Sequence, residues 1–266
     1  MKEIPILINK YYDRPSVFQP ENLLREARRQ KNITEITIPG ICILDPDGDI
    51  EEYVIRKHNA QLNLAWACYH TKLYEFNYGE VNVGIIGRAV GASFAVLVAE
   101  QLFASGCKLL LSMTSSGQLT QPMTPPYFIL IVKAIRDEGT SYHYLPPGDF
   151  SFLNDNLRDR LVNGFEKVDQ MIFPGSTWTT DAPYRETAES INHYKEIGIH
   201  AVEMEASALY AFAKAKNKSV VCFAHVTNQM ASISGDFEKG KHNGSKDALE
   251  VLLRTIELLR VVLDLK

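Results

Sequence analysis

The sequence predicts an α/β protein, a single domain built on a mostly parallel mixed β-sheet that helices flank. Short apolar runs alternate with helical patterns along most of the chain, which is typical of strand–helix units. The closing segment Ser245–Leu263 carries apolar residues at three- and four-residue steps, so one stripe of that helix faces a core. The chain has 266 residues, of which 45% are hydrophobic, enough for one large core.

The N-terminal part of the chain is less regular. Prolines interrupt it repeatedly, and only a short charged helix over Glu21–Lys31 is expected there. We therefore describe residues 1–266 as one domain in which residues 1–35 form a divergent N-terminal segment. The run Asp45-Pro46-Asp47-Gly48-Asp49 has the short polar side chains, fixed φ and permissive glycine of a tight turn.

Helices and strands then alternate as far as the C-terminal helix. The pattern predicts helices over Asn59–Phe76, Ala92–Phe103, Pro126–Arg136, Asn154–Asn163, Tyr184–Lys195, Ala206–Lys216 and Ser245–Leu263. It predicts strands over Val81–Ile86, Lys108–Met113, Ser141–Leu145, Val168–Phe173, Ile199–Val202 and Ser219–Val226. Ligands of such sheets bind where strands end and helices begin. Polar or glycine-rich segments follow these strands at Gly87–Ser93, Thr114–Gly117, Ser176–Arg185, Glu203–Ser207 and Thr227–Gln229.

Composition argues against several classes of partner. The formal net charge of -4 and the sequence pI of about 6.0 give no basis for binding nucleic acid or an anionic membrane. No apolar run approaches the ~18 residues of a membrane span, and no secretory leader is recognisable. The 4 cysteines are far apart, and neither they nor the 7 histidines have metal-ligand spacing. We expect a cytoplasmic protein with reduced cysteines and no metal.

The sharpest chemical feature is Glu203-Met204-Glu205, which follows a buried strand. Carboxylates at such a place are unfavourable unless they are bound to something. An ionised carboxylate only accepts hydrogen bonds, so it suits the two hydroxyls of a ribose, and a methionine offers an adaptable apolar surface to the sugar. The alternative is structural, because acids near a helix N-terminus are stabilised by its dipole.

Two further segments have the chemistry of an anion or sugar site. Gly84–Ala92 is a strand followed by a glycine turn and a helix start, where backbone N–H groups can approach an anion. Ser112–Gly117 offers hydroxyl groups after a buried strand. Ordinary turn chemistry accounts for each segment equally well when it is taken alone.

The segment Val202–Leu209 resembles the ribose-binding segment of the nucleoside phosphorylase family. The resemblance is closest to the uridine phosphorylase branch, although the chain is divergent. Gly87–Leu102, Leu110–Leu119 and Val220–Gln229 resemble three further regions of the family, in the same order. The resemblance implies the family's α/β fold and cleavage of a nucleoside by phosphate to free base and ribose 1-phosphate. It also implies phosphate as co-substrate, no other cofactor, and a homo-oligomer, either a dimer or a hexamer built as a trimer of dimers.

The same resemblance assigns roles to individual residues. On the sugar side these are Glu205 on the ribose hydroxyls, Met204 against the sugar, and Glu203 as the first glutamate of the motif. On the phosphate side, Ser115 matches a hydroxyl that contacts phosphate and ribose, and Ser116 and Gly87 adjoin it. On the base side the expected residues are Asn228, where purine-specific members have an aspartate, and Asp181, Tyr184, Arg185 and Trp178 of the loop Thr177–Glu186. Asn228, Asp181 and Glu205 are the candidate catalytic residues.

The chain also departs from the family pattern at the phosphate. Ser112 and Gly48 stand where phosphorylases usually have arginines, which leaves Arg88 as a candidate replacement or, alternatively, an ordinary surface ion pair. Hydrolysis by water and non-catalytic nucleoside binding therefore remain alternatives to phosphorolysis. On the base side, Asp181 is either an acid or a helix N-cap, and Trp178 and Tyr184 either stack on a base or pack in the core. The choice between purine and pyrimidine stays open.

Overall fold

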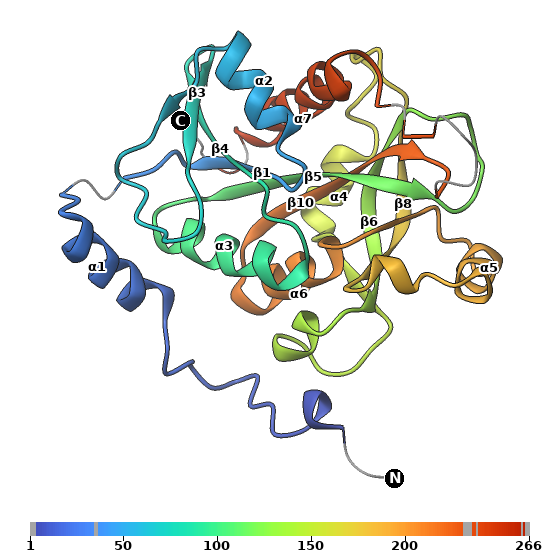
Figure 1. Ribbon diagram of the computed structural model, residues 1–266, viewed down its shortest axis with the longest axis horizontal. Coiled ribbons are helices and arrows are strands. Elements are labelled where there is room, and N and C mark those ends of the chain that lie inside the picture. The colour runs from blue at the N-terminus through green and yellow to red at the C-terminus, as the bar shows by residue number, and fades with distance from the viewer. Residues whose placement is uncertain (1–3, 35–36, 231–235, 238, 262, 264–266) are drawn as a thin grey trace.

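The structure is a computed structural model that describes residues 4–34, 37–230, 236–237, 239–261 and 263 (Figure 1). Its strands are β1 Ile41–Asp45, β2 Gln61–Leu62, β3 Tyr74–Tyr78, β4 Val81–Gly87, β5 Leu109–Gln118, β6 Tyr127–Asp137, β7 Phe150–Phe152, β8 Ile172–Thr180, β9 Ala201–Glu203 and β10 Ser219–Asn228. Its α-helices are α1 Pro20–Lys31, α2 Asp49–Lys57, α3 Ala92–Ala104, α4 Asp155–Leu161, α5 Ala188–Glu196, α6 Ala206–Lys216 and α7 Ser245–Leu259. Short 3₁₀ turns are η1 Pro5–Leu7, η2 Thr140–His143, η3 Pro183–Arg185 and η4 Lys241–Gly244.

All these strands belong to one 10-stranded sheet in the order β10-β6-β8-β9-β5-β1-β4-β3-β2, with β7 beside β6. Strand β10 also pairs with β5, so β5, β10, β6, β8 and β9 close into a ring. Parallel and antiparallel pairs occur equally among the described strands. The single α/β domain with a mixed sheet is therefore confirmed, with more antiparallel pairing than the repeating pattern predicts.

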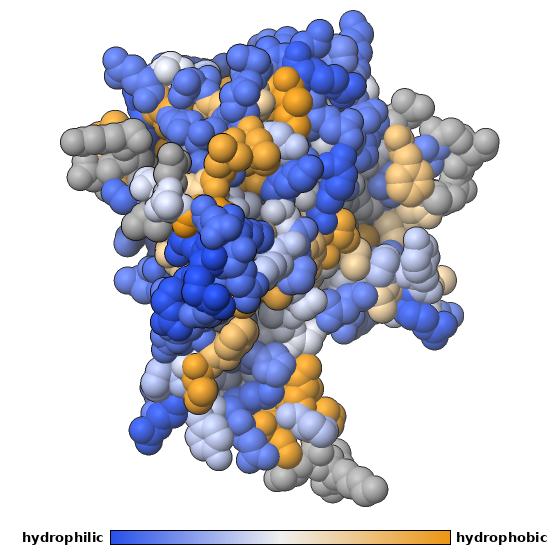
Figure 2. Space-filling model, turned by 60° about the vertical axis from the view of Figure 1, so that its left-hand side comes forward, coloured by the Kyte–Doolittle hydropathy of each residue, from blue (hydrophilic) through white to orange (hydrophobic). Residues whose placement is uncertain are grey.

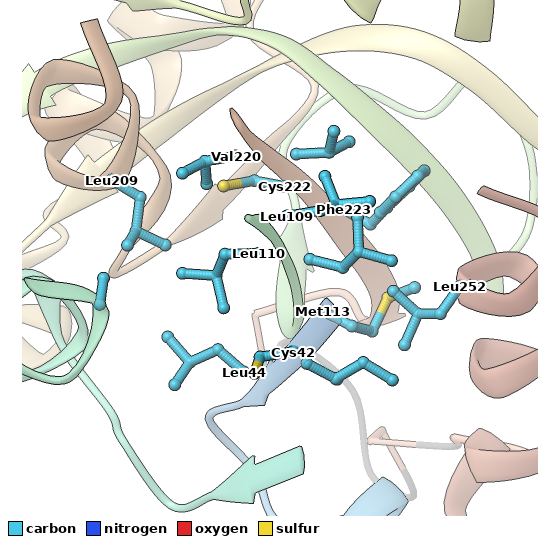
Figure 3. Close-up of a cluster of buried hydrophobic side chains, with 14 of the residues drawn as sticks. Cys42, Leu44, Leu109, Leu110, Met113, Leu209, Val220, Cys222, Phe223 and Leu252 are labelled. Atoms are coloured by element: carbon cyan, nitrogen blue, oxygen red, sulfur yellow. The ribbon is translucent and has the colours of Figure 1, made fainter. Parts of the chain in front are cut away.

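Helices cover both faces of the sheet. Helices α2 and α7 lie together over one face and α3 and α6 over the other (Figure 1). Leu209 of α6 and Leu252 of α7 reach the central strands β5 and β10 from opposite sides (Figure 3). Every residue of α6 from Ala206 to Ala213 is buried, as expected of a helix enclosed by protein on all sides. This burial holds the N-terminus of α6 firmly at the end of strand β9.

Three of the predicted elements are wrong. Residues 126–136 form strand β6 instead of a helix, because a continuous apolar run of this length fits a fully buried strand as well as a helix. Residues 59–76 form an irregular segment with the short strand β2 and the start of β3, and residues 141–145 begin in the 3₁₀ turn η2. Strand β1 and helix α2, which flank the Asp45–Asp49 turn, were not predicted. The strand predicted over Val168–Phe173 overlaps β8 only at residues 172–173, and strand β7 was not predicted either. The polar residues 114–117 and 176–180, expected to follow strands, lie inside β5 and β8. The remaining helices and strands agree with the expected types, with shifted ends.

The surface is consistent with the charge pattern of the sequence. Figure 2 shows a face on which hydrophilic residues predominate and hydrophobic residues form small separate groups. Within the described residues, no helix combines the length and apolar character that crossing a membrane requires.

Candidate functional site

The two glutamates of the Glu203-Met204-Glu205 segment have different environments. Glu203 is 3% exposed, and its carboxylate is fully used by the protein. Its Oε2 accepts hydrogen bonds from the backbone N–H groups of Glu205 and Ala206, each at 2.7 Å, and its Oε1 accepts from the hydroxyls of Thr177 at 3.0 Å and Thr179 at 2.5 Å. Glu203 thus satisfies the first amides of α6, which favours its structural role over a direct contact with substrate.

Glu205 is also buried, but its carboxylate is only half used. Its Oε1 accepts a hydrogen bond from the N–H of Gly91 at 2.7 Å, just before helix α3. Its Oε2 is buried and has no hydrogen-bond partner among the described residues. Burial, followed by the charge of Glu203, raises the pKa of Glu205 to about 8. An orphaned buried carboxylate oxygen requires a partner, and hydroxyl groups of a ligand are suitable donors.

Met204 precedes Glu205 in the chain, and Asn228 lies at the end of a strand in the same sheet. Met204 is half-buried between the two glutamates. Asn228 ends β10 beside Gly117 of β5. Its amide donates to the carbonyl of Ser116 and the hydroxyl of Thr227, both at 3.3 Å, while its oxygen accepts from the N–H of Met230 at 3.0 Å. The Asn228 amide therefore already has protein partners on both of its polar atoms.

The Asp45–Asp49 turn places a second group of carboxylates beside Ser115. Asp47 accepts hydrogen bonds from both donors of Ser115, the backbone N–H at 3.1 Å and the hydroxyl at 3.0 Å. Lys239 bridges the turn, with its ammonium 3.2 Å from Asp47 Oδ2 and 2.7 Å from Asp49 Oδ2. The donors that the family resemblance assigns to phosphate are thus bound to a carboxylate of the chain itself.

Other titratable groups line this acidic turn. Asp45 is buried and accepts from the N–H of Glu51 at 2.9 Å; burial raises its pKa to about 7. His225 is 5% exposed and stacks on Phe128 with ring centroids 4.4 Å apart. Burial, followed by the charge of Lys239, lowers the pKa of His225 to about 4, so its imidazole is neutral near pH 7.

Arg88 and Gly87 turn toward helix α2. The Arg88 guanidinium pairs with Glu51 at 2.8 Å and with Glu52 at 2.5 Å, and the N–H of Gly87 donates to Glu51 at 2.7 Å. The backbone N–H of Arg88 donates to the carbonyl of Asp45 at 2.9 Å, and its side chain lies over Gly48. This geometry does not support a phosphate role for either residue; the ion-pair alternative describes Arg88.

Two serine hydroxyls of β5 are buried without a hydrogen-bond partner among the described residues, those of Ser112 and Ser116. Ser112 stands on β5 beside Leu44 of β1 and Cys222 of β10, inside the sheet. The missing arginine at this position is therefore replaced by a small, deeply buried hydroxyl.

Of the loop residues predicted to contact the base, one is buried in the core and the other three are exposed at the surface. Trp178 is 3% exposed, and its indole N–H donates to Asp137 at 2.9 Å, so it packs in the core. Tyr184 is 99% exposed, and Arg185 is exposed as well. Asp181 is exposed and accepts from the N–H of Gly139 at 2.8 Å. It is not the N-cap of the following turn, because Ala182 occupies that position.

The acid-lined part of the site was missed from the sequence. Asp47 and Lys239 are 192 residues apart. Asp47 lies in the turn that stands where phosphorylases have a phosphate arginine, but the resemblance assigned a role to neither residue. The available signal was the density of aspartates in the turn that lacks the expected arginine. No group of three or more metal-binding side chains suited to holding an ion occurs among residues whose positions are described.

The fold and the site together define an α/β protein with a half-used buried carboxylate at the end of its sheet. The family model of the phosphorylase superfamily matches residues 41–257. The chain belongs to this superfamily, which includes nucleoside phosphorylases and nucleosidases.

Similar proteins include a guanosine phosphorylase of Halorubrum lacusprofundi, 25% identical over 196 residues that cover 71% of this chain and 81% of that protein. A DeoD-type purine nucleoside phosphorylase of Colwellia psychrerythraea is 22% identical over 69% of this chain and 79% of its own length. Among solved structures, purine nucleoside phosphorylase from Toxoplasma gondii, in complex with immucillin-H, has a TM-score of 0.72 at 16% identity, covering 84% of this chain and 92% of its own. AMP nucleosidase from Bacteroides thetaiotaomicron has a TM-score of 0.71 at 15% identity, covering 91% and 98%. These structural similarities support the fold.

Proposed function

We propose that this protein cleaves the N-glycosidic bond of a nucleoside whose ribose is held by Glu205. The observation that carries the proposal is the buried Oε2 of Glu205, which lacks a partner while Oε1 is fixed by Gly91. Vicinal ribose hydroxyls supply the missing donors. Met204, the half-buried residue before Glu205 in the chain, would offer the sugar an apolar contact.

Glu205 also suits the chemistry of bond cleavage. The leaving base takes the electron pair of the glycosidic bond, and positive charge develops on the ribose ring, as in glycoside hydrolysis. Ribose hydroxyl donors and positive charge on the ring both favour the ionised form of Glu205, and this carboxylate orients the sugar and stabilises the positive charge. Because the N–H of Gly91 holds Oε1 of Glu205 by a hydrogen bond, little reorganisation is needed when the charge appears.

The geometry favours water as the acceptor. Asp47 occupies both donors of Ser115, and Arg88 is paired with two glutamates, so no free cation of the described residues faces an incoming phosphate. Phosphorolysis, which the sequence favoured, is the second candidate function. It is supported by the phosphorylase relatives and by Lys239, whose ammonium is near Ser115 through Asp47.

The base side sets no clear preference between purine and pyrimidine. Asn228 can donate to a departing base only by exchanging one of the two protein partners of its amide nitrogen. Tyr184 and Arg185 are exposed and free to approach a base, while Trp178 supports the loop from the core. The proposal requires no metal or organic cofactor.

The test is to incubate the protein with purine and pyrimidine nucleosides, with and without inorganic phosphate, and to identify the sugar product. Free ribose, released at a rate that phosphate does not change, supports the proposal. Ribose 1-phosphate formed only with phosphate moves the protein to the second candidate. Nucleoside binding without base release leaves the non-catalytic alternative, and Glu205→Gln identifies whether that binding uses the same carboxylate.

A further inference from the structure

We infer that Asp47 determines which nucleophile attacks the ribose, because its carboxylate lies where an anionic nucleophile such as phosphate would bind. Lys239 is its positioning residue. The inference rests on the proposed function for its catalytic part. Its anion-binding part stands on the contacts of Asp47, Ser115 and Lys239 alone.

The three groups form an anion site that the chain itself occupies. A backbone N–H, a hydroxyl and an ammonium converge on one carboxylate, at 3.1, 3.0 and 3.2 Å from its oxygens. Such mixed donors are what proteins use to bind oxyanions. Since both Ser115 donors point at Asp47, a free phosphate gains them only by displacing that side chain.

The space beside Asp47 matches the size of water. The small cavity among Asp45, Asp47, Asp49, Ser115, His225 and Lys239 has about 10 Å³ of free room. This is close to the ~10–15 Å³ that one water molecule needs. A phosphate, with five heavy atoms, does not fit this space while Asp47 stays in place.

The charges that surround Asp47 oppose a second anion. Asp45 on β1 and Asp49 at the start of α2 share the cavity, His225 of β10 is neutral near pH 7, and Glu205 lies close enough for Asp47 to raise its pKa. Lys239 is the cation within this described group. The single positive charge of Lys239 neutralises only part of the negative charge of the two aspartates that share it. Electrostatic repulsion of phosphate by the turn therefore adds to its steric exclusion.

The reaction balances with these groups. A water oxygen held by Asp47 attacks C1′ of the ribose, and the C1′–N bond breaks with its electron pair passing to the base. One proton of the water passes to the Asp47 carboxylate, and the base takes up a proton from solvent. The products are free ribose and free base. Lys239 acts through Asp47, by holding the carboxylate in position against Ser115.

The experiment compares Asp47→Ala, Asp47→Asn, Lys239→Met and the double variant Asp47→Ala/Lys239→Met with wild type. Binding of inorganic phosphate is measured by calorimetry, and nucleoside cleavage is followed by product analysis. Lys241→Met is the matched control, because Lys241 is exposed on the same segment. Thermal unfolding of each variant verifies that it is folded.

We expect Asp47→Ala to bind phosphate at least about tenfold more tightly than wild type, because one repelling charge is gone and the Ser115 donors are free. The double variant should lose that gain. Asp47→Asn keeps an acceptor oxygen on Ser115, so it should bind phosphate less tightly than the alanine variant. Both Asp47 variants should lose ~10²–10⁴-fold in hydrolysis, the usual contribution of a general base. Lys239→Met should lower kcat and change the acidic limb of the pH–rate profile, whereas Lys241→Met should change neither.

Unchanged phosphate binding in a folded Asp47→Ala protein would overturn the anion-site assignment, whatever the activity of the wild type. Full hydrolysis by the same variant would overturn the role of Asp47 as base. If wild-type protein cleaves no nucleoside, the proposed function fails, and phosphate binding still decides the inference about Asp47 and Lys239.

Discussion

Two carboxylate regions meet at the end of this sheet, and they differ in how completely the protein satisfies them. At the sugar region, Glu205 has one bonded oxygen and one buried oxygen without a partner. At the acidic turn, Asp47 and Asp49 are engaged by Ser115, Lys239 and Asn243. The first region therefore has an unused acceptor, whereas the carboxylates of the second are already engaged by the chain.

The difference shows that a family resemblance can hold at one region and lapse at its neighbour. At the proposed sugar region, the Glu-Met-Glu segment that carries the resemblance is present and Glu205 has an unused oxygen. The acidic turn has carboxylates and a glycine in place of a phosphate arginine. Arg88, the candidate replacement for that arginine, instead pairs with Glu51 and donates its backbone N–H to the carbonyl of Asp45. The proposed sugar binding and the proposed choice of nucleophile can therefore be tested separately.

The largest expected effect comes from Glu205. Glu205→Gln keeps the volume but replaces one acceptor oxygen by a donor, so ribose loses a hydrogen-bond partner. We expect kcat/KM for the cleaved nucleoside to fall ~10²–10³-fold. The wild-type carboxyl is mostly protonated well below pH 8 in the folded state but ionises above about pH 5 once unfolded, so thermal stability should be unchanged at about pH 5 and increased at higher pH. Steady-state kinetics and calorimetry measure the two effects. A variant with wild-type kinetics would remove Glu205 from the sugar site.

Glu203 is the matched test at the same segment. Glu203→Gln places an amide nitrogen against N–H or hydroxyl donors that now bind a carboxylate oxygen. Leaving buried donors unsatisfied should lower the free energy of unfolding by ~2–4 kcal/mol, measured by urea denaturation. Equal stabilities of Glu203→Gln and Glu205→Gln would contradict the division between a satisfied and an unsatisfied glutamate.

The free energy of unfolding should depend on pH differently in wild type and in Glu205→Gln. The folded pKa of about 8 lies above the ordinary value of 4.5, so the folded state binds more protons between these values and its stability falls as pH rises through them. The slope is at most about 1.4 kcal/mol per pH unit. Asp45 contributes in the same direction in both proteins. The stability gap between Glu205→Gln and wild type should therefore widen from about pH 5 to about pH 8. A constant gap in urea denaturation would show that this carboxyl has an ordinary pKa.

The smallest expected effect comes from Arg88. Its side chain is 56% exposed and pairs with two glutamates, so Arg88→Met should lower the free energy of unfolding by only about 1 kcal/mol. The response of cleavage to added phosphate should stay that of wild type. If added phosphate changes cleavage by this variant differently from wild type, Arg88 takes part in phosphate binding, and the contrast between the sugar region and the acidic turn no longer holds.

Much of the fold was predictable because it depends on local patterns. The amphipathic period of α7 and the apolar runs of β4 and β10 identify these elements directly. Strand β6 could not be separated from a helix, since its residues are apolar on both faces. Only pairing with β8 and β10, distant in sequence, decides between them.

The site was predictable on the same terms. Glu205 belongs to a compact segment, so its place is visible in the sequence. The engagement of Asp47 by Ser115 depends on β1 and β5 being neighbours in the sheet, and that of Lys239 on a segment 192 residues away. Neither contact leaves a local pattern. Trp178 and Tyr184 show the same limit, because two aromatic residues six positions apart differ completely in burial.

The attachment of Asp47 to the turn has a consequence for how this protein responds to its surroundings. A group carried by the same chain is present at an effective concentration set by geometry, which reaches millimolar values even for flexible linkers. A dissolved anion must compete with that constant local supply. The acidic turn should therefore be insensitive to changes in phosphate concentration. The rate of cleavage should then follow the concentration of the nucleoside alone.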